Sequence, residues 1–73
     1  MEPLKLGLIG LGGMGQNHLE KEKGLDSIHF VGVADVVPSL VDEVSRTYDV
    51  PGFYDPQQLI DSGSCEAILI ATP

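Results

Sequence analysis

The stretch from Lys5 to Gly15, with the sequence KLGLIGLGGMG, constrains the fold of this chain more than any other feature. It is typical of a short apolar strand, a tight turn and the start of a helix, and Gly10, Gly12 and Gly15 have the spacing G-x-G-x-x-G. In a dinucleotide site the first glycine permits the turn, the second lets backbone approach a pyrophosphate, and the third lets the helix pack close to the strand. The positive end of the helix then faces the anion.

A carboxylate further along the chain supports the same interpretation. The apolar run Phe30–Ala34 ends at Asp35, about 20 residues after Gly15, where such sites place the acceptor for the adenosine ribose hydroxyls. Asp35 favours NAD over NADP, because it would repel a 2′-phosphate and no Arg or Lys follows it within 36–39. The alternative interpretation, without a ligand, is a tight strand–helix turn whose aspartate caps a helix.

Hydrophobic periodicity predicts alternating strands and helices along the whole chain. We expect strands at 4–9, 28–34, 53–54 and 67–71, with helices at about 13–23, 38–48 and just after Asp55. The link between the first two strands is long enough only for a helical crossover, so these strands should be parallel. The predicted fold class is therefore α/β, the first half of a doubly wound (Rossmann) parallel sheet, β-α-β-α-β-α-β, with strand order 3-2-1-4.

Several packing details follow from these patterns. The fourth strand, 67–71, is apolar throughout and should be deeply buried, and Leu59 and Ile60 should form the buried face of the third helix. Asp55 should cap that helix, with Gln58 completing a capping box. The first helix should have an apolar stripe of Leu11, Met14, His18 and Leu19. Gly7 and Gly32, inside strands, indicate close packing of a helix.

The composition excludes several functional classes. The chain has 73 residues, 42% of them hydrophobic, which is enough for one small domain. Its net charge of −7 would repel nucleic acid and anionic membranes, and no apolar stretch is long enough to cross a bilayer. Cys65 is the single cysteine, so an internal disulfide is excluded, and the isolated His18 and His29 offer no metal site. We expect a soluble, cytoplasmic protein without a metal.

A family resemblance is carried by three segments: 5–15 with His18 closely following, 31–35, and 67–73. Together they look like the glucose–fructose oxidoreductase / inositol dehydrogenase / rhizopine-catabolism (Gfo/Idh/MocA) family. The resemblance implies hydride transfer between NAD(P) and a sugar, cyclitol or related hydroxyl compound. By position, it assigns Gly10, Gly12, Gly13 and Met14 to the pyrophosphate, Asp35 to the adenosine ribose, and Ala71, Thr72 and Pro73 to the wall beside the nicotinamide half.

The resemblance also implies a further domain and a sequence segment that residues 1–73 do not include. Members of the family have a C-terminal α/β domain, and a Glu-Lys-Pro segment after the fourth strand whose lysine assists proton transfer. Lys21 and Lys23, near the end of a helix, do not replace that lysine. We therefore expect 1–73 to be a partial NAD(P)-binding Rossmann domain, a fragment of a parent oxidoreductase. The substrate domain and all catalytic residues would be absent, and the fragment would be inactive by itself.

Other functions stay open at this point. They are a related reductase for biliverdin-like or amino-acid-pathway substrates, a non-catalytic NAD-binding or redox-sensing module, and a structural fragment without nucleotide affinity. His18 is expected to be a packed core or interface histidine, and Cys65 a small buried residue rather than a nucleophile. The exposed edge of 67–71 predicts self-association. The other expected partner is a small-molecule substrate of the parent protein, with no nucleic acid and no membrane.

Overall fold

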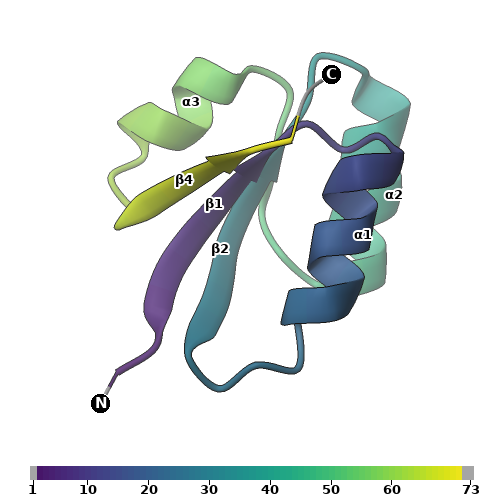
Figure 1. The fold of residues 1–73 in the computed structure, drawn as a ribbon. Helices are drawn as coiled ribbons and strands as arrows, with labels where there is room; N and C mark the ends of the chain where they lie inside the picture. Colours follow the sequence, from purple (N-terminus) through teal and green to yellow (C-terminus); the bar gives the residue numbers. More distant parts are fainter. Residues whose placement is uncertain (1, 72–73) are drawn as a thin grey trace.

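A computed structural model describes residues 2–71 and shows a parallel sheet between two layers of helices (Figure 1). The described strands are β1 (Leu4–Ile9), β2 (Ile28–Ala34), β3 (Gly52–Phe53) and β4 (Ala67–Ile70), in the order β3-β2-β1-β4. The helices α1 (Gly13–Glu22), α2 (Pro38–Tyr48) and α3 (Pro56–Asp61) alternate with the strands. All strand pairs are parallel, so the predicted fold class and strand order are confirmed.

Local signals explain where the second and third helices begin and end. Pro38 occupies the first turn of α2, and Asp49 stops the helix in the left-handed conformation, with φ of 54°. Asp55 caps α3 as predicted, because its Oδ1 accepts a hydrogen bond from the Gln57 N–H at 3.0 Å. The predicted capping box is wrong, since the Gln58 side chain makes no return bond to Asp55 among the described residues.

The larger core lies between the sheet and the helix pair α1 and α2 (Figure 1). In α1 the row formed by Gly15 and Leu19 faces the sheet, so the stripe predicted for this helix is wrong for Met14 and His18. These two residues form the neighbouring i, i+4 row, and Met14 is 61% exposed. The fully buried side chains of this core are Leu8, Leu11, Leu19, Val33, Val41 and Val44.

A smaller core lies on the opposite face of the sheet, under α3. Leu59 is fully buried there, because Gly32 leaves space for it: a Cβ on Gly32 would lie 2.5 Å from Leu59 Cδ1. A Cβ on Gly7 would likewise lie 3.2 Å from Leu59 Cδ2. The predicted close packing of a helix against these two glycines is therefore confirmed. Ile60 is 48% exposed, so its predicted burial is wrong, because only one side of this short helix meets the sheet.

The fourth strand is less buried than predicted. Ala67, Ile68 and Leu69 are half-buried, and Ile70 is 65% exposed. Among the described residues β4 pairs with β1 on one side only, so its other edge has no neighbouring strand. No helix within 2–71 is both long enough and apolar enough to cross a membrane.

Candidate functional site

The glycine turn joins β1 to α1 at the carboxyl edge of the sheet. Gly10 has φ of 98°, a left-handed conformation that favours glycine, and its N–H donates to the Ala34 carbonyl at 2.9 Å. A Cβ on Gly15 would lie 1.8 Å from the Gly10 carbonyl oxygen, so α1 can begin this close to the turn only with glycine there. In contrast, a Cβ on Gly12 or Gly13 would meet no atom within 4 Å, which leaves this side of the turn open.

The end of β2 places Asp35 directly against the glycine turn. Its Oδ2 accepts a hydrogen bond from the Leu11 N–H at 2.7 Å, and its Oδ1 accepts one from the Val37 N–H at 2.9 Å. The carboxylate thus connects the glycine turn to the start of α2, where Val37 is the N-cap residue. A carboxylate has about four acceptor positions, so two such bonds leave room for ligand hydroxyls.

A cavity of about 270 Å³ lies where the turn, the end of β2 and the end of β4 meet. We call it the glycine-turn cavity. Val37 and Leu40 line it, and sequence reasoning missed them, although their place after Asp35 at the start of α2 brings them to this edge. Thr72 and Pro73 lie outside the described residues. The other predicted site residues all line the cavity: Gly10, Gly12, Gly13, Met14, Asp35 and Ala71.

The polar groups of the glycine-turn cavity are backbone amides and one carboxylate. The first N–H groups of α1 have no intrahelical acceptor, and the first turn of this helix contains no acidic residue. No acidic residue of α1 itself therefore offsets the partial positive charge of the helix end. Asp35 is the only titratable side chain among the described residues of the lining. This arrangement suits a phosphate-containing ligand with hydroxyl groups nearby, and it offers no pair of groups for acid–base catalysis.

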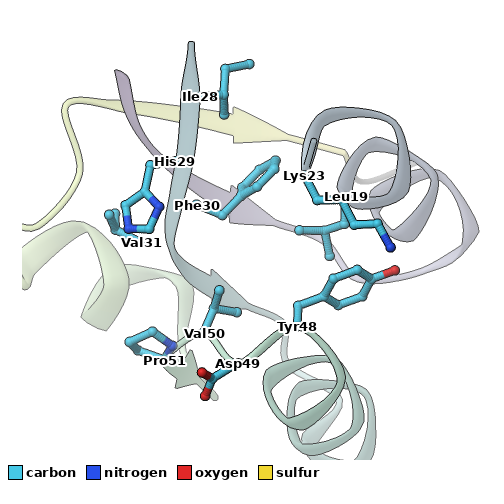
Figure 2. Close-up of a pocket in the computed structure, with 10 residues that line it drawn as sticks. All are labelled: Leu19, Lys23, Ile28, His29, Phe30, Val31, Tyr48, Asp49, Val50 and Pro51. Atoms are coloured by element: carbon cyan, nitrogen blue, oxygen red, sulfur yellow. The ribbon is translucent and has the colours of Figure 1, made fainter. Parts of the chain in front are cut away.

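Another cavity, of about 370 Å³, lies at the opposite end of the sheet, between the C-terminal ends of α1 and α2 (Figure 2). Its lining combines apolar side chains such as Leu19, Phe30 and Val50 with Lys23 and Asp49. Lys23 Nζ lies 3.1 Å from Glu20 Oε2, so its charge already has a partner. The candidate site is placed at the glycine turn instead, where free backbone donors and a carboxylate converge.

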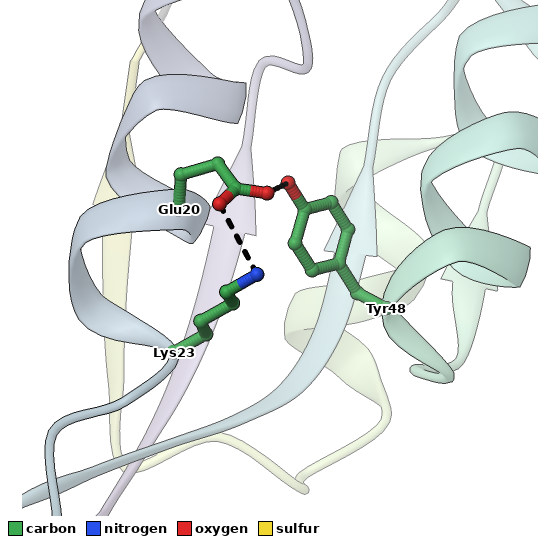
Figure 3. A network of polar contacts seen from close by, with 3 residues as sticks. All are labelled: Glu20, Lys23 and Tyr48. Carbon is green, nitrogen blue, oxygen red and sulfur yellow. Dashed lines mark hydrogen bonds and ion pairs between the residues drawn. The ribbon is translucent and has the colours of Figure 1, made fainter.

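A polar network beside this second cavity joins α1 to α2 (Figure 3). Tyr48 Oη donates to Glu20 Oε1 at 2.6 Å, and Lys23 Nζ lies 5.7 Å from the centre of the Tyr48 ring. The hydrogen bond from Tyr48, followed by the contacts with Lys23, lowers the pKa of Glu20. The same hydrogen bond raises the pKa of Tyr48. None of these three groups lines the glycine-turn cavity, and their contacts connect the two helices.

The remaining candidate residues lie outside the glycine-turn cavity. His18 is half-exposed, with its Nδ1 3.6 Å from Glu22 Oε1 on the next turn of α1, and His29 is exposed on β2. Cys65 is half-buried, which raises the pKa of its thiol, and its Sγ lies over Gly7. Within the part of the chain that the structure describes, no three His, Cys, Asp or Glu side chains gather closely enough to hold a metal ion.

Comparison with known proteins points to one family. A model of the Gfo/Idh/MocA group, described as an oxidoreductase family with an NAD-binding Rossmann fold, matches residues 4–73. The chain is 31% identical over 77 residues to the rhizopine catabolism protein MocA of Rhizobium meliloti, covering 100% of this chain and 23% of that protein. It is 30% identical over 70 residues to the myo-inositol 2-dehydrogenase of Thermotoga maritima, covering 94% of this chain and 21% of that enzyme.

A solved structure shows the same fold. The WlbA dehydrogenase from Bordetella pertussis, in complex with NADH and UDP-GlcNAcA, superposes with a TM-score of 0.88 at 23% sequence identity. The match covers 100% of this chain and 22% of that one. The chain thus spans less than a quarter of the length of each of these proteins.

Proposed function

This chain belongs to the Gfo/Idh/MocA oxidoreductase family with an NAD-binding Rossmann fold, and we propose that its glycine turn binds NAD for an enzyme that oxidises or reduces a sugar, cyclitol or related hydroxyl compound. One observation carries the proposal: the open side of the turn, the Asp35 carboxylate and Ala71 line a single cavity. The names of the relatives, a myo-inositol 2-dehydrogenase and a rhizopine catabolism protein, support the substrate class.

The residues of the glycine-turn cavity fit a dinucleotide. Gly12 and Gly13 have no Cβ and would let the pyrophosphate approach the backbone, beside Met14. Asp35 would accept hydrogen bonds from the adenosine ribose with its remaining lone pairs. The volume of the cavity, about 270 Å³, is slightly below the roughly 300–1,000 Å³ that is usual for ligand pockets. This cavity would therefore hold only part of the dinucleotide. Ala71, Thr72 and Pro73 are proposed to border its nicotinamide half.

Charge at the ribose position favours NAD over NADP. A 2′-phosphate would meet the negative Asp35, and the lining of the cavity contains no Lys or Arg among the described residues. Val36, which follows Asp35, is 74% exposed and brings no positive charge. We therefore propose NAD as the preferred cofactor.

Turnover is proposed to need residues beyond these 73. Bound NAD would supply the chemistry of hydride transfer, whereas proton transfer to or from a substrate hydroxyl needs a general acid or base. Asp35 is the only titratable side chain in the described lining, and both of its oxygens hold backbone amides. We propose that the 73-residue chain binds the cofactor without catalysing the reaction. We also propose that the protein is located in the cytoplasm. Absorbance at 340 nm with myo-inositol and NAD should show no turnover by the chain alone.

Calorimetric titration of the chain with NAD and NADP tests the binding proposal. We expect millimolar or tighter affinity for NAD, and affinity for NADP at least about tenfold weaker, a difference of about 1.4 kcal/mol. Gly12→Val should abolish binding without unfolding the chain, because the Gly12 backbone is extended and a Cβ there meets nothing within 4 Å. Gly24→Val is the matched control, since Gly24 has the same open surroundings far from the turn. An unmodified chain that does not bind millimolar NAD would overturn the proposal.

We also propose that the chain self-associates through the free edge of 67–71. The edge of β4 that faces away from β1 leaves backbone donors and acceptors unpaired among the described residues, and Ile70 is 65% exposed. A second copy could pair with this edge. Sedimentation velocity should show dimers or larger assemblies that Ile70→Lys reduces, whereas a monomer at high concentration would contradict the proposal.

A further inference from the structure

The backbone of Leu11 is held on both sides by polar side chains. Its N–H donates to Asp35 Oδ2 at 2.7 Å, and its carbonyl oxygen accepts from Gln16 Nε2 at 2.9 Å. The Leu11 side chain is itself fully buried in the larger core. Leu11 is thus a fixed point in the glycine turn, although the residues on either side of it are glycines.

Three consecutive peptide groups of the turn are each held by a different contact. Asp35 holds the peptide between Gly10 and Leu11 through its N–H. The peptide between Gly12 and Gly13 is held by α1, because the Gln16 backbone N–H donates to the Gly12 carbonyl at 3.0 Å. The peptide between them, formed by the Leu11 carbonyl and the Gly12 N–H, is held by the side chain of Gln16.

The hydrogen bond from the Gln16 side chain to the Leu11 carbonyl determines the direction in which the Gly12 N–H points. A peptide group is planar and trans, so its N–H points opposite to its carbonyl, and fixing the Leu11 carbonyl also fixes the Gly12 N–H. Gly12 lines the glycine-turn cavity, and its N–H has no acceptor among the described residues. The successive glycines at 12 and 13 leave this backbone unusually free to rotate, which makes a side-chain restraint effective.

We propose that Gln16 is a positioning residue, which orients the Gly12 N–H towards the pyrophosphate before the ligand arrives. This inference rests on the proposed NAD-binding function. A donor that is already oriented need not be ordered on binding, so the affinity is higher than for a mobile turn. The effect should be confined to the pyrophosphate, because Gln16 does not line the glycine-turn cavity, in which Asp35 is proposed to bind the adenosine ribose.

The test compares two ligands and two variants of the ¹⁵N-labelled chain by NMR titration. Gln16→Met keeps the length of the side chain but removes the donor, and Asn17→Ala is the control at the exposed next position. We expect Gln16→Met to weaken NAD binding about three- to tenfold, the effect of losing one hydrogen bond. Binding of adenosine, which lacks the pyrophosphate, should change less than about twofold, and Asn17→Ala should match the unmodified chain for both ligands.

The ligand-free spectra provide a second readout. In Gln16→Met the Gly12 amide resonance should shift or broaden, because its peptide group is no longer held. Unchanged NAD affinity, or an equal loss for NAD and adenosine, would overturn the proposal. If the unmodified chain binds neither ligand, the proposed function fails. In that case, an unchanged Gly12 resonance in Gln16→Met would overturn the role of Gln16 as well. A broadened resonance would support the restraint of the Gly12 peptide group by Gln16.

Discussion

Asp35 Oδ2 lies 2.7 Å from the backbone nitrogen of Leu11 and accepts its hydrogen bond. This contact joins the end of β2 to the turn that follows β1, across 24 positions of the sequence. The carboxylate that is proposed to select NAD therefore also supports the shape of the cavity that would receive it. Substitutions of Asp35 should consequently change stability as well as affinity.

Asp35→Ala should lower the free energy of unfolding by about 1–3 kcal/mol, because it leaves the Leu11 N–H without an acceptor. Asp35→Asn keeps a carbonyl acceptor for the Leu11 N–H but loses the bond to the Val37 N–H, so it should cost less than Asp35→Ala, about 0.5–1.5 kcal/mol, while weakening the preference for NAD over NADP. Urea denaturation followed by circular dichroism measures both changes. Asp26→Ala, at an exposed loop position, should stay within about 0.5 kcal/mol of the unmodified chain. If Asp35→Ala is as stable as this control, the contact does not support the turn.

Two glycines of the same turn should respond oppositely to alanine. Gly15→Ala places a Cβ 1.8 Å from the Gly10 carbonyl oxygen and should destabilise the chain by about 3 kcal/mol, as overpacking does. Gly13→Ala meets nothing within 4 Å and begins α1, so it should be neutral or stabilise the chain by about 0.4–1 kcal/mol. Thermal unfolding of the two variants measures the difference. Equal melting temperatures would contradict the close approach of α1 to the turn.

The elements and their order could be predicted from the sequence because each depends on a local signal or a topological rule. The glycine spacing predicted the turn, the apolar runs predicted the strands, and parallel crossovers then brought Asp35 to the same edge as Gly10. The binding roles of the glycine-turn residues stay predictions, as do the positions of Thr72 and Pro73. What local signals could not provide was the extent of burial, which depends on neighbouring elements.

Three errors and one omission illustrate this limit. Met14 belongs to an apolar pattern, but the side of α1 that meets the sheet is set by the close contact of Gly15 with Gly10. Ile60 and the fourth strand are apolar, yet their exposure depends on how much of the sheet α3 covers. The contact from Gln16 back to the turn has no periodic signal, because it arises from one side-chain conformation.

The contrast between Leu59 and Ile60 gives a stability test of the smaller core. Leu59 is fully buried against Gly7 and Gly32, so Leu59→Ala should cost about 2–5 kcal/mol through lost contacts and the cavity left behind. Ile60→Ala removes a side chain that is 48% exposed and should cost less than about 1 kcal/mol. Urea denaturation compares them directly. A similar loss of stability in both variants would contradict the packing of α3 against the sheet through Leu59 rather than Ile60.

The two tyrosines of the chain should ionise at unusually high pH. The hydrogen bond to Glu20 raises the pKa of Tyr48, and the hydrogen bond to Asp42 raises the pKa of Tyr54, both from an ordinary value of 10.0. Absorbance at 295 nm during alkaline titration should therefore show both tyrosines ionising with midpoints above that value. Glu20→Ala should return Tyr48 to ordinary ionisation, and Asp42→Ala should do so for Tyr54.

The network of Glu20, Tyr48 and Lys23 also predicts how stability depends on pH. Because the folded-state pKa of Tyr48 is raised, its contribution is complete below 10.0 and is lost as the pH rises through the folded pKa. The folded-state pKa of Glu20 is lowered from 4.5, so its contribution is present above 4.5 and is lost as the pH falls through the folded pKa. Tyr48→Phe removes the hydrogen bond that both shifts share, so it should flatten the stability profile at both ends. An unchanged profile in this variant would show that the contact between α1 and α2 does not form in solution.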